Sequence, residues 1–301
     1  MKLQVLSALV CAMFLPALAL ADTFGMGSNQ FTIDFVNINH AGNAADAGGT
    51  PGCGAVGYNY RIGKYEVTNA QWNAFTSAVG APVGNPSTAF DQGAYFTGNQ
   101  QPMSEVSWYE AAQFCNYLTS GDKSKGAYQF SGNNTNPGNF IGTDRSAAQV
   151  VYGTIYVLPT EDEWYKAAYF KPDASGYSLY ANGTNTIPFM SASCYGKGSE
   201  GQPWNVGTGT MEQNGTFDMM GNVYEWSETP INNSYIIRGG AFPYYMGGGF
   251  ESSARGKGEA YEEYAPFGFR VASIPEPATL LLLGLGGMVV RKHVARSGNT
   301  T

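Results

Sequence analysis

Thiols and imidazoles, the side chains most often used for metal and redox chemistry, are scarce in this sequence. The chain of 301 residues holds four cysteines and two histidines. Cys53, Cys115 and Cys194 lie outside the apolar N-terminal segment, and no two of them lie within four residues of each other. This spacing excludes a Cys-x-x-Cys redox motif and a zinc-type thiolate cluster. Three thiols allow at most one internal disulfide.

The two histidines also limit the metal and catalytic sites that the chain can form. His293 lies in the C-terminal tail, and His40 lies in a Gly-, Asn- and Ala-rich segment that we interpret as a loop. One imidazole cannot build a histidine-rich iron or zinc site. A Ser-His-Asp triad would have to use His40, and no nucleophile-elbow motif supports it.

The N-terminus reads as a cleavable signal peptide over residues 1–21. Lys2 precedes an apolar run from Val5 to Leu20, and the small residues Ala19 and Ala21 end it. This order of a charged start, an apolar middle and a small-x-small site predicts secretion. The net charge of -7 argues against a nucleic-acid partner, because phosphate neutralisation needs clustered Lys and Arg.

The C-terminal residues 274–301 form a second targeting segment. Pro275, Glu276 and Pro277 precede the uncharged run 278–290, and Arg291 and Lys292 follow it. We interpret the run as a short transmembrane segment with its basic end on the cytoplasmic face. The pattern resembles the PEP-CTERM sorting signal of Gram-negative bacteria. The resemblance implies an exosortase-type processing protease, transient anchoring in the inner membrane, and delivery to the cell surface or extracellular matrix.

Between these ends, three capping boxes predict helix starts. Thr68 with Gln71, Ser107 with Glu110, and Thr160 with Glu163 each place a Ser or Thr three residues before a Glu or Gln. Apolar residues recur at helical spacing after each box. A Trp lies just inside each helix, and we interpret these Trp side chains as core anchors.

Short alternating segments predict strands at 60–67, 155–158, 236–238 and 269–271. Long Gly-, Asn- and Ser-rich stretches at 81–101, 120–150 and 172–215 separate the elements. Aromatic residues reach 14%, which indicates ordered loops packed by rings. Residues 22–273 are therefore predicted to form one α+β domain with few helices, short strands and long loops.

Four segments, in order, resemble the formylglycine-generating enzyme family, also called sulfatase-modifying factor domains. They read RIGKYEVTN (61–69), PMSEVSWYEA (102–111), LPTEDEW (158–164) and FDMMGNVYEW (217–226), and RGG at 238–240 and GFR at 268–270 follow. The resemblance covers residues 31–273. It implies a C-type-lectin-like α+β fold, in agreement with the loop-rich pattern.

The resemblance also implies a copper(I) site of two cysteines five residues apart. Here the matching positions hold Gly247 and Ser252, so both thiols are missing. Copper(I) prefers soft thiolates, and a serine hydroxyl is hard and un-ionised at neutral pH. The remaining cysteines lie far from this segment in sequence. We therefore expect no copper site and no catalytic residue of the known kind.

One calcium site of the family matches this sequence. The resemblance implies ligands from Asp218, Gly221, Val223 and Glu225, and these oxygen donors suit Ca²⁺. The alternative is that Asp218 and Glu225 only cap a turn.

Three functions remain open at this point. The first is a surface binding or structural module that contacts a glycan or peptide through Tyr244, Tyr245, Arg255 and Tyr261. The second is a formylglycine-generating-type oxidoreductase with a rearranged active site. The third is a hydrolase that would need a carboxylate pair, whereas the acidic cluster at 259–263 is more typical of a solvated loop.

Overall fold

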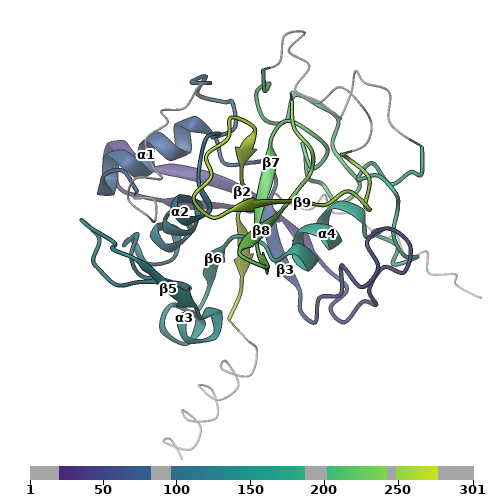
Figure 1. Ribbon diagram of the computed structural model, residues 1–301, viewed down its shortest axis with the longest axis horizontal. Coiled ribbons are helices and arrows are strands. Elements are labelled where there is room, and N and C mark those ends of the chain that lie inside the picture. Colours follow the sequence, from purple (N-terminus) through teal and green to yellow (C-terminus); the bar gives the residue numbers. More distant parts are fainter. Residues whose placement is uncertain (1–19, 83–95, 187–201, 243–248, 277–301) are drawn as a thin grey trace, which may run out of the picture.

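The computed structural model describes residues 20–82, 96–186, 202–242 and 249–276. Four α-helices and three small sheets alternate with long loops in this part of the chain (Figure 1). The predicted signal peptide, up to residue 19, and the predicted transmembrane segment 278–290 lie outside the described residues. Among the described residues, no helix is long and apolar enough to cross a membrane.

A five-stranded antiparallel sheet joins the two ends of the domain. Its strand order is β1-β2-β3-β11-β6. β11, the last strand of the described chain, lies between β3 and β6, so the C-terminal residues complete the centre of this sheet. The predicted start of the mature domain at Asp22 falls inside β1. The strands are β1 (Leu20–Phe24), β2 (Phe31–Ile38), β3 (Tyr60–Gly63), β6 (Ile155–Val157) and β11 (Ala272–Ile274).

A second sheet of four strands has the order β10-β7-β8-β9. β10 pairs with β7 in parallel, and the other pairs are antiparallel. A separate hairpin joins β4 and β5. These strands are β7 (Tyr224–Ile231), β8 (Ser234–Arg238), β9 (Gly256–Glu259), β10 (Phe267–Gly268), β4 (Tyr128–Phe130) and β5 (Phe140–Thr143).

The three predicted capping boxes are confirmed. They begin α1 (Asn69–Val79), α2 (Trp108–Ser120) and α4 (Glu161–Tyr169), and each has both reciprocal hydrogen bonds. These bonds satisfy backbone N–H groups that have no partner within the first helical turn. The Trp side chains of all three helices are buried, as predicted.

Aromatic rings fill the core between the sheets and helices. Trp72, Phe75 and Phe114 contact one another, and Phe269 contacts Trp72 and Phe114. Ring pairs at such distances add favourable edge-to-face contacts to the burial of apolar area. Phe269 connects the two sheets, because β10 and β11 flank it in the chain.

The strand predicted at 269–271 is wrong in its position. The chain crosses here from the four-stranded sheet to the five-stranded sheet, so the paired residues lie on either side, in β10 and β11. The crossing segment stays extended, because Val67 N–H donates to Phe269 O and Gly63 N–H donates to Val271 O.

The predicted loop 120–150 contains a hairpin, β4–β5, and most of a helix, α3 (Arg145–Tyr152), which the sequence analysis missed. A 3₁₀ turn, η1 (Gly27–Asn29), lies between β1 and β2. Asp144 caps α3 by accepting a hydrogen bond from Ala147 N–H, without a capping-box partner. α3 is short, only Ala148 of it is buried, and no capping box marks its start.

Candidate functional site around Ser252

Ser252, the position of the second copper-binding cysteine in the resemblance, is buried. Its side chain and backbone are 2% exposed. Its N–H donates to Leu179 O at 2.9 Å. Its carbonyl accepts hydrogen bonds from Thr50 Oγ1 at 2.7 Å and from Arg238 Nη1 at 3.1 Å. Both backbone groups of Ser252 therefore have partners within the protein.

The loop 46–54 covers this residue. Asp46 accepts hydrogen bonds from the N–H groups of Gly48 and Gly49, and Tyr165 Oη donates to Asp46 Oδ2 at 2.6 Å. Burial raises the pKa of Asp46, but the bonds from Tyr165, Gly48 and Gly49 outweigh it and leave that pKa lowered. The loop is thus ordered by an ionised carboxylate at its start.

Close packing requires a glycine at position 49. A Cβ atom there would lie 2.1 Å from Ser252 Oγ and 2.4 Å from Tyr165 Oη. The backbone of the loop therefore contacts Ser252 directly. Among the described residues, Ser252 is thus covered by this loop.

A buried carboxylate with two guanidinium groups lies beneath the loop. Glu161, the first residue of α4, binds Arg238 Nε at 2.9 Å. It also binds Arg255 through Nε at 2.8 Å and Nη2 at 2.6 Å. Arg238 and Glu161 are 1% and 3% exposed, so this contact is desolvated. The hydrogen bond to Glu161 raises the pKa of Arg255.

Cys53, far from the Ser252 segment in sequence, lies on the loop that covers it. Thr50, which contacts both Ser252 and Arg238, also accepts the Cys53 N–H at 3.1 Å through its carbonyl. Burial is the largest cause that raises the pKa of the Cys53 thiol, followed by Glu161. Such a thiol is a poor nucleophile and a poor metal ligand at neutral pH.

Cys53 and Cys115 are free and buried thiols. Cys115 lies in α2, and its burial raises its pKa well above the usual range. Cys194 lies outside the described residues. Cys53 and Cys115 do not pair with each other, and a disulfide with Cys194 stays a prediction.

Of the residues predicted to contact a glycan or peptide, the structure describes Arg255 and Tyr261. Arg255 is held by Glu161, with its side chain 37% exposed. Tyr261 follows β9 and is 45% exposed. Tyr244, Tyr245 and the other cysteine position, Gly247, lie outside the described residues. Tyr264, which the sequence did not single out, is 57% exposed on the same segment as Tyr261.

The loop predicted to bind calcium is buried beside the second sheet. Asp218 Oδ2 accepts the Gly207 N–H at 2.7 Å, and burial raises the pKa of Asp218 to about 6. Gly221 N–H donates to Gly239 O, and Val223 N–H donates to Glu66 Oε1. Glu225 is fully buried.

The expected ligands fit a calcium ion only in part. Glu225 already accepts from Arg270 through both carboxylate oxygens, at 2.5 and 2.6 Å, and from Trp164 Nε1 at 2.8 Å. A calcium ion would have to share or displace these contacts. Within the described ranges, no group of three or more His, Cys, Asp or Glu side chains is placed to hold a metal. Calcium binding stays a prediction.

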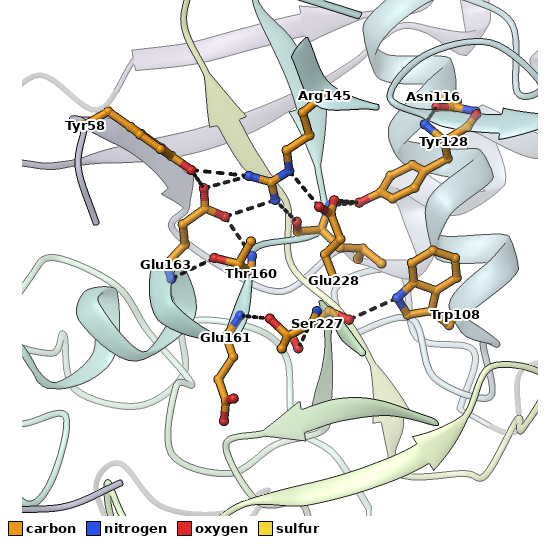
Figure 2. A network of polar contacts seen from close by, with 12 residues as sticks. Tyr58, Trp108, Asn116, Tyr128, Arg145, Thr160, Glu161, Glu163, Ser227 and Glu228 are labelled. Atoms are coloured by element: carbon orange, nitrogen blue, oxygen red, sulfur yellow. Dashed lines mark hydrogen bonds and ion pairs between the residues drawn. The ribbon is translucent and has the colours of Figure 1, made fainter. Parts of the chain in front are cut away.

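A second polar network holds α4, the helix that begins at Glu161 (Figure 2). Arg145, the first residue of α3, donates to Glu163 at 2.8 and 3.1 Å and pairs with Glu228 through Nε at 2.9 Å. Tyr128 Oη donates to Glu228 Oε2 at 2.7 Å, and Tyr58 Oη donates to Glu163 Oε1. The network thereby ties α3, α4, β4 and β7 together.

Sequence reasoning missed Glu161, Arg238 and the loop 46–54. Glu161 reads as an ordinary acidic residue in the first turn of a capped helix, where it suits the helix dipole. Its partners are 77 and 94 residues away in the chain. The only local signal was the Gly-rich composition of 48–54, which is typical of a backbone that approaches another segment closely.

Comparison with known proteins decides the family. Residues 40–274 match the family model described as a sulfatase-modifying factor enzyme 1-like domain. The chain belongs to this family. Its α+β, C-type-lectin-like fold follows, as the sequence predicted.

Residues 273–295 match the PEP-CTERM protein-sorting motif. The motif includes Pro275, Glu276 and Pro277, of which Pro277 lies outside the described residues. This sulfatase-modifying factor domain is therefore part of an exported protein of the Gram-negative cell surface.

Among characterised proteins, the chain is 28% identical over 208 residues to chaperone protein LppX of Paenibacillus barcinonensis, covering 61% of this chain and 69% of LppX. Solved structures of similar fold include Treponema denticola variable protein 1, with 22% identity, a TM-score of 0.58, and coverage of 86% of this chain and 99% of that one. CarF has 20% identity, a TM-score of 0.59, and coverage of 81% and 99%. PvdO from Pseudomonas aeruginosa has 16% identity, a TM-score of 0.53, and coverage of 85% and 98%. At these identities the structures show the shared fold.

Proposed function

We propose that this domain is a binding or structural module of the cell surface, without the copper oxidase centre of its family. The observation that carries the proposal is the environment of Ser252. The residue at the position of a copper ligand is buried under the loop 46–54, and both its backbone groups are hydrogen bonded within the protein. A position that is packed in this way supports the loop, and its hydroxyl is no substitute for a thiolate.

The alternative is an oxidoreductase with a rearranged centre, and Cys53 would be its thiol. Cys53 lies on the loop that covers Ser252, which favours the idea by proximity. Burial and the nearby Glu161 both raise its pKa, so its thiolate is disfavoured at neutral pH. Copper(I) in a two-thiolate site also needs a second cysteine; Cys115 lies in α2, and Cys194 lies outside the described residues.

The proposed ligand is a glycan or peptide that contacts the exposed tyrosines after β9. Tyr261 and Tyr264 are about half exposed and present amphipathic rings on one loop. The predicted residues Tyr244 and Tyr245 belong to the preceding segment of the chain. Arg255 contributes a fixed positive charge that is only partly offset, because it shares Glu161 with Arg238.

Array binding of the purified full chain tests this ligand site. We expect specific binding to a glycan or peptide class, and we expect Tyr261→Ala to weaken it by about tenfold, within the range of an aromatic contact residue. Met26→Ala is the matched control, because Met26 is 86% exposed and lies outside the proposed surface. Binding that is absent, or equal in both variants, would contradict the proposal.

The proposed role of the C-terminal tail is membrane insertion followed by processing. Residues 278–290 insert in the inner membrane until an exosortase-type protease cleaves at Pro275, Glu276 and Pro277. The sorting-motif match supports the processing step. The mass of the C-terminal peptide, measured on protein recovered from the cell surface, tests the processing step. An intact C-terminus at Thr301 would contradict processing.

Calcium at the loop 218–225 is a separate proposal. The carboxylate of Asp218 and the carbonyls of Gly221 and Val223 are oxygen donors of the kind that Ca²⁺ prefers. Thermal unfolding in excess calcium and in chelator measures its effect on the melting temperature. A higher melting temperature with calcium supports the site, and an unchanged one contradicts it.

A further inference from the structure

A hollow of about 600 Å³ lies where the start of α1 faces β2. This volume falls within the range of about 300–1,000 Å³ that is typical of small-molecule sites in proteins. We call it the β2–α1 hollow. Its polar lining includes Gln30, Thr32, Asp34, Tyr65, Gln71 and Gln100. The hollow is therefore large enough to hold a small molecule or a short stretch of a polymer.

Hydrogen bonds within the protein fix the shape of the hollow. Gln71 joins α1 to β2, because its Oε1 accepts the Thr68 N–H at 2.8 Å and its Nε2 donates to Thr32 O at 2.8 Å. In another wall, Val206 N–H donates to Gln100 O at 2.8 Å. The hollow is thus preformed, which lowers the entropy that a ligand and its site lose on binding.

Several polar side chains of the hollow are available to a ligand. Within the described chain, Gln30, Asp34 and Gln100 make no side-chain hydrogen bond or ion pair. Gln30 and Gln100 are exposed, and Asp34 is half-buried. Together they offer amide donors and acceptors and a carboxylate. A ligand can reach these groups without breaking a contact within the protein.

The charge of the hollow restricts the kind of ligand. Among its described lining residues, Asp34 carries the single charge, and no Lys, Arg or His is present. The nearby Lys64 places its ammonium over the rings of Tyr65 and Phe217, at 5.3 and 5.4 Å from their centroids. An anion would meet a carboxylate without a compensating cation, and Ca²⁺ would meet too few carboxylate ligands. The hollow therefore favours a neutral ligand.

The backbone around the hollow is already paired. β2 lies between β1 and β3, so it has no free edge to which a peptide strand could be added. The capping box at Thr68 occupies the start of α1. Recognition in the hollow therefore depends on its side chains.

We propose that the β2–α1 hollow binds a neutral saccharide. A sugar hydroxyl both donates and accepts hydrogen bonds, so it matches the amides of Gln30 and Gln100 and the carboxylate of Asp34. The apolar face of a sugar ring suits the amphipathic ring of Tyr65. None of the lining residues belongs to β9 or to the segment after it. The hollow is thus a second site, separate from the tyrosine surface of Tyr261 and Tyr264 proposed above.

Saturation-transfer difference NMR of the purified full chain, kept in a detergent without sugar, tests the hollow. The probes are cellotetraose, maltotetraose, mannotetraose and N-acetylated chitotetraose. We expect saturation transfer to at least one of them. Asp34→Ala should weaken that binding by about tenfold and Gln100→Ala by a few-fold, because hydrogen bonds to a charged group are the stronger ones.

Gln129→Ala is the matched control, because Gln129 is exposed on β4 and does not line this hollow. It should bind the probe as the parent does. The melting temperatures of all three variants should equal that of the parent, since each change removes a side chain from the surface.

The outcomes separate the hollow from the tyrosine surface. Binding that is lost in Tyr261→Ala but unchanged in Asp34→Ala and Gln100→Ala overturns the hollow and supports the tyrosine surface. Binding that is lost in Asp34→Ala and kept in Tyr261→Ala supports the hollow, even if the tyrosine surface binds nothing. The absence of saturation transfer to all four probes overturns the hollow, and so does binding of peptides alone.

The charge of the ligand provides an independent check. Tetragalacturonate is an anionic saccharide, and Asp34 should repel it. We expect it to bind the parent about tenfold more weakly than the best neutral probe, and we expect Asp34→Asn to reduce this difference. Equal binding of the neutral and the anionic saccharide to the parent would contradict the proposed ligand class.

Discussion

At the scale of single residues, Glu161 has the largest predicted effect on stability. It is the buried counter-charge of both Arg238 and Arg255. Glu161→Gln leaves the fully buried Arg238 without a carboxylate, and removing one partner of a buried pair typically costs about 3–5 kcal/mol. Chemical denaturation measures this loss. Lys125→Gln is the control, because Lys125 is 65% exposed in its ion pair with Asp122 and the change should cost about 0–1 kcal/mol. Equal losses in the two variants would contradict the account.

A second residue-scale prediction concerns pH. Burial raises the pKa of Glu110 well above its usual range, and Glu263 adds to the shift. Below the unfolded pKa of a glutamate, the group is protonated in both states and imposes no penalty. As pH rises, the unfolded chain releases its proton first, so stability falls until the pH exceeds the folded pKa.

Glu110→Gln removes this titration and keeps the capping box, as Gln71 does in the box of α1. We expect the variant to gain stability over the parent at pH 8 and to match it near pH 4. Free energies of unfolding at the two pH values provide the comparison. A gain that is the same at both values would show that the carboxyl does not carry the pH dependence.

At the scale of elements, the loop 46–54 depends on its contact with Ser252. Gly49→Ala places a methyl group 2.1 Å from Ser252 Oγ, and overpacking of this kind typically costs about 1–3 kcal/mol. Gly57→Ala is the matched control, because no atom lies within 4 Å of a Cβ there. If both variants unfold at the same denaturant concentration, the loop does not pack on Ser252 as described.

The sequence predicted elements wherever the determining contacts are local. The boxes at Thr68, Ser107 and Thr160 lie within four residues, and all three helices begin there. The strand at 269–271 was misplaced because its two neighbours belong to different sheets, which is a long-range property. α3 was missed because it is only eight residues long, follows a Gly- and Asn-rich stretch and has no capping box.

In the candidate site, too, the sequence predicted local features and missed those that depend on long-range contacts. The loss of both family cysteines is visible from Gly247 and Ser252 alone, once the resemblance supplies the positions. The burial of Ser252 is not visible, because Thr50 and Leu179 reach it from distant parts of the chain. Hydrogen bonds between residues 202 positions apart leave no periodic signal in the sequence.

At the scale of the whole molecule, β11 is the last strand of the folded domain and directly precedes the sorting motif. This strand lies between β3 and β6 and ends one residue before Pro275. Cleavage within 275–277 therefore leaves the sheet complete. A chain that ends after Pro277 should melt at the temperature of the full chain, whereas a chain that ends after Val271 should not fold. Calorimetry of the two truncations distinguishes these outcomes. A folded chain lacking β11 would contradict the described sheet.

The most direct test of the central claim is copper(I) titration of the reduced, purified full chain against a competing chelator, followed by mass analysis of a cysteine-containing substrate peptide. A formylglycine-generating enzyme serves as the positive control, and Cys53→Ala reports on the remaining nearby thiol. The account predicts no stoichiometric tight copper and no aldehyde product, with the parent and Cys53→Ala alike. One tightly bound copper per chain with aldehyde formation, lost in Cys53→Ala, would contradict it and establish a rearranged oxidase.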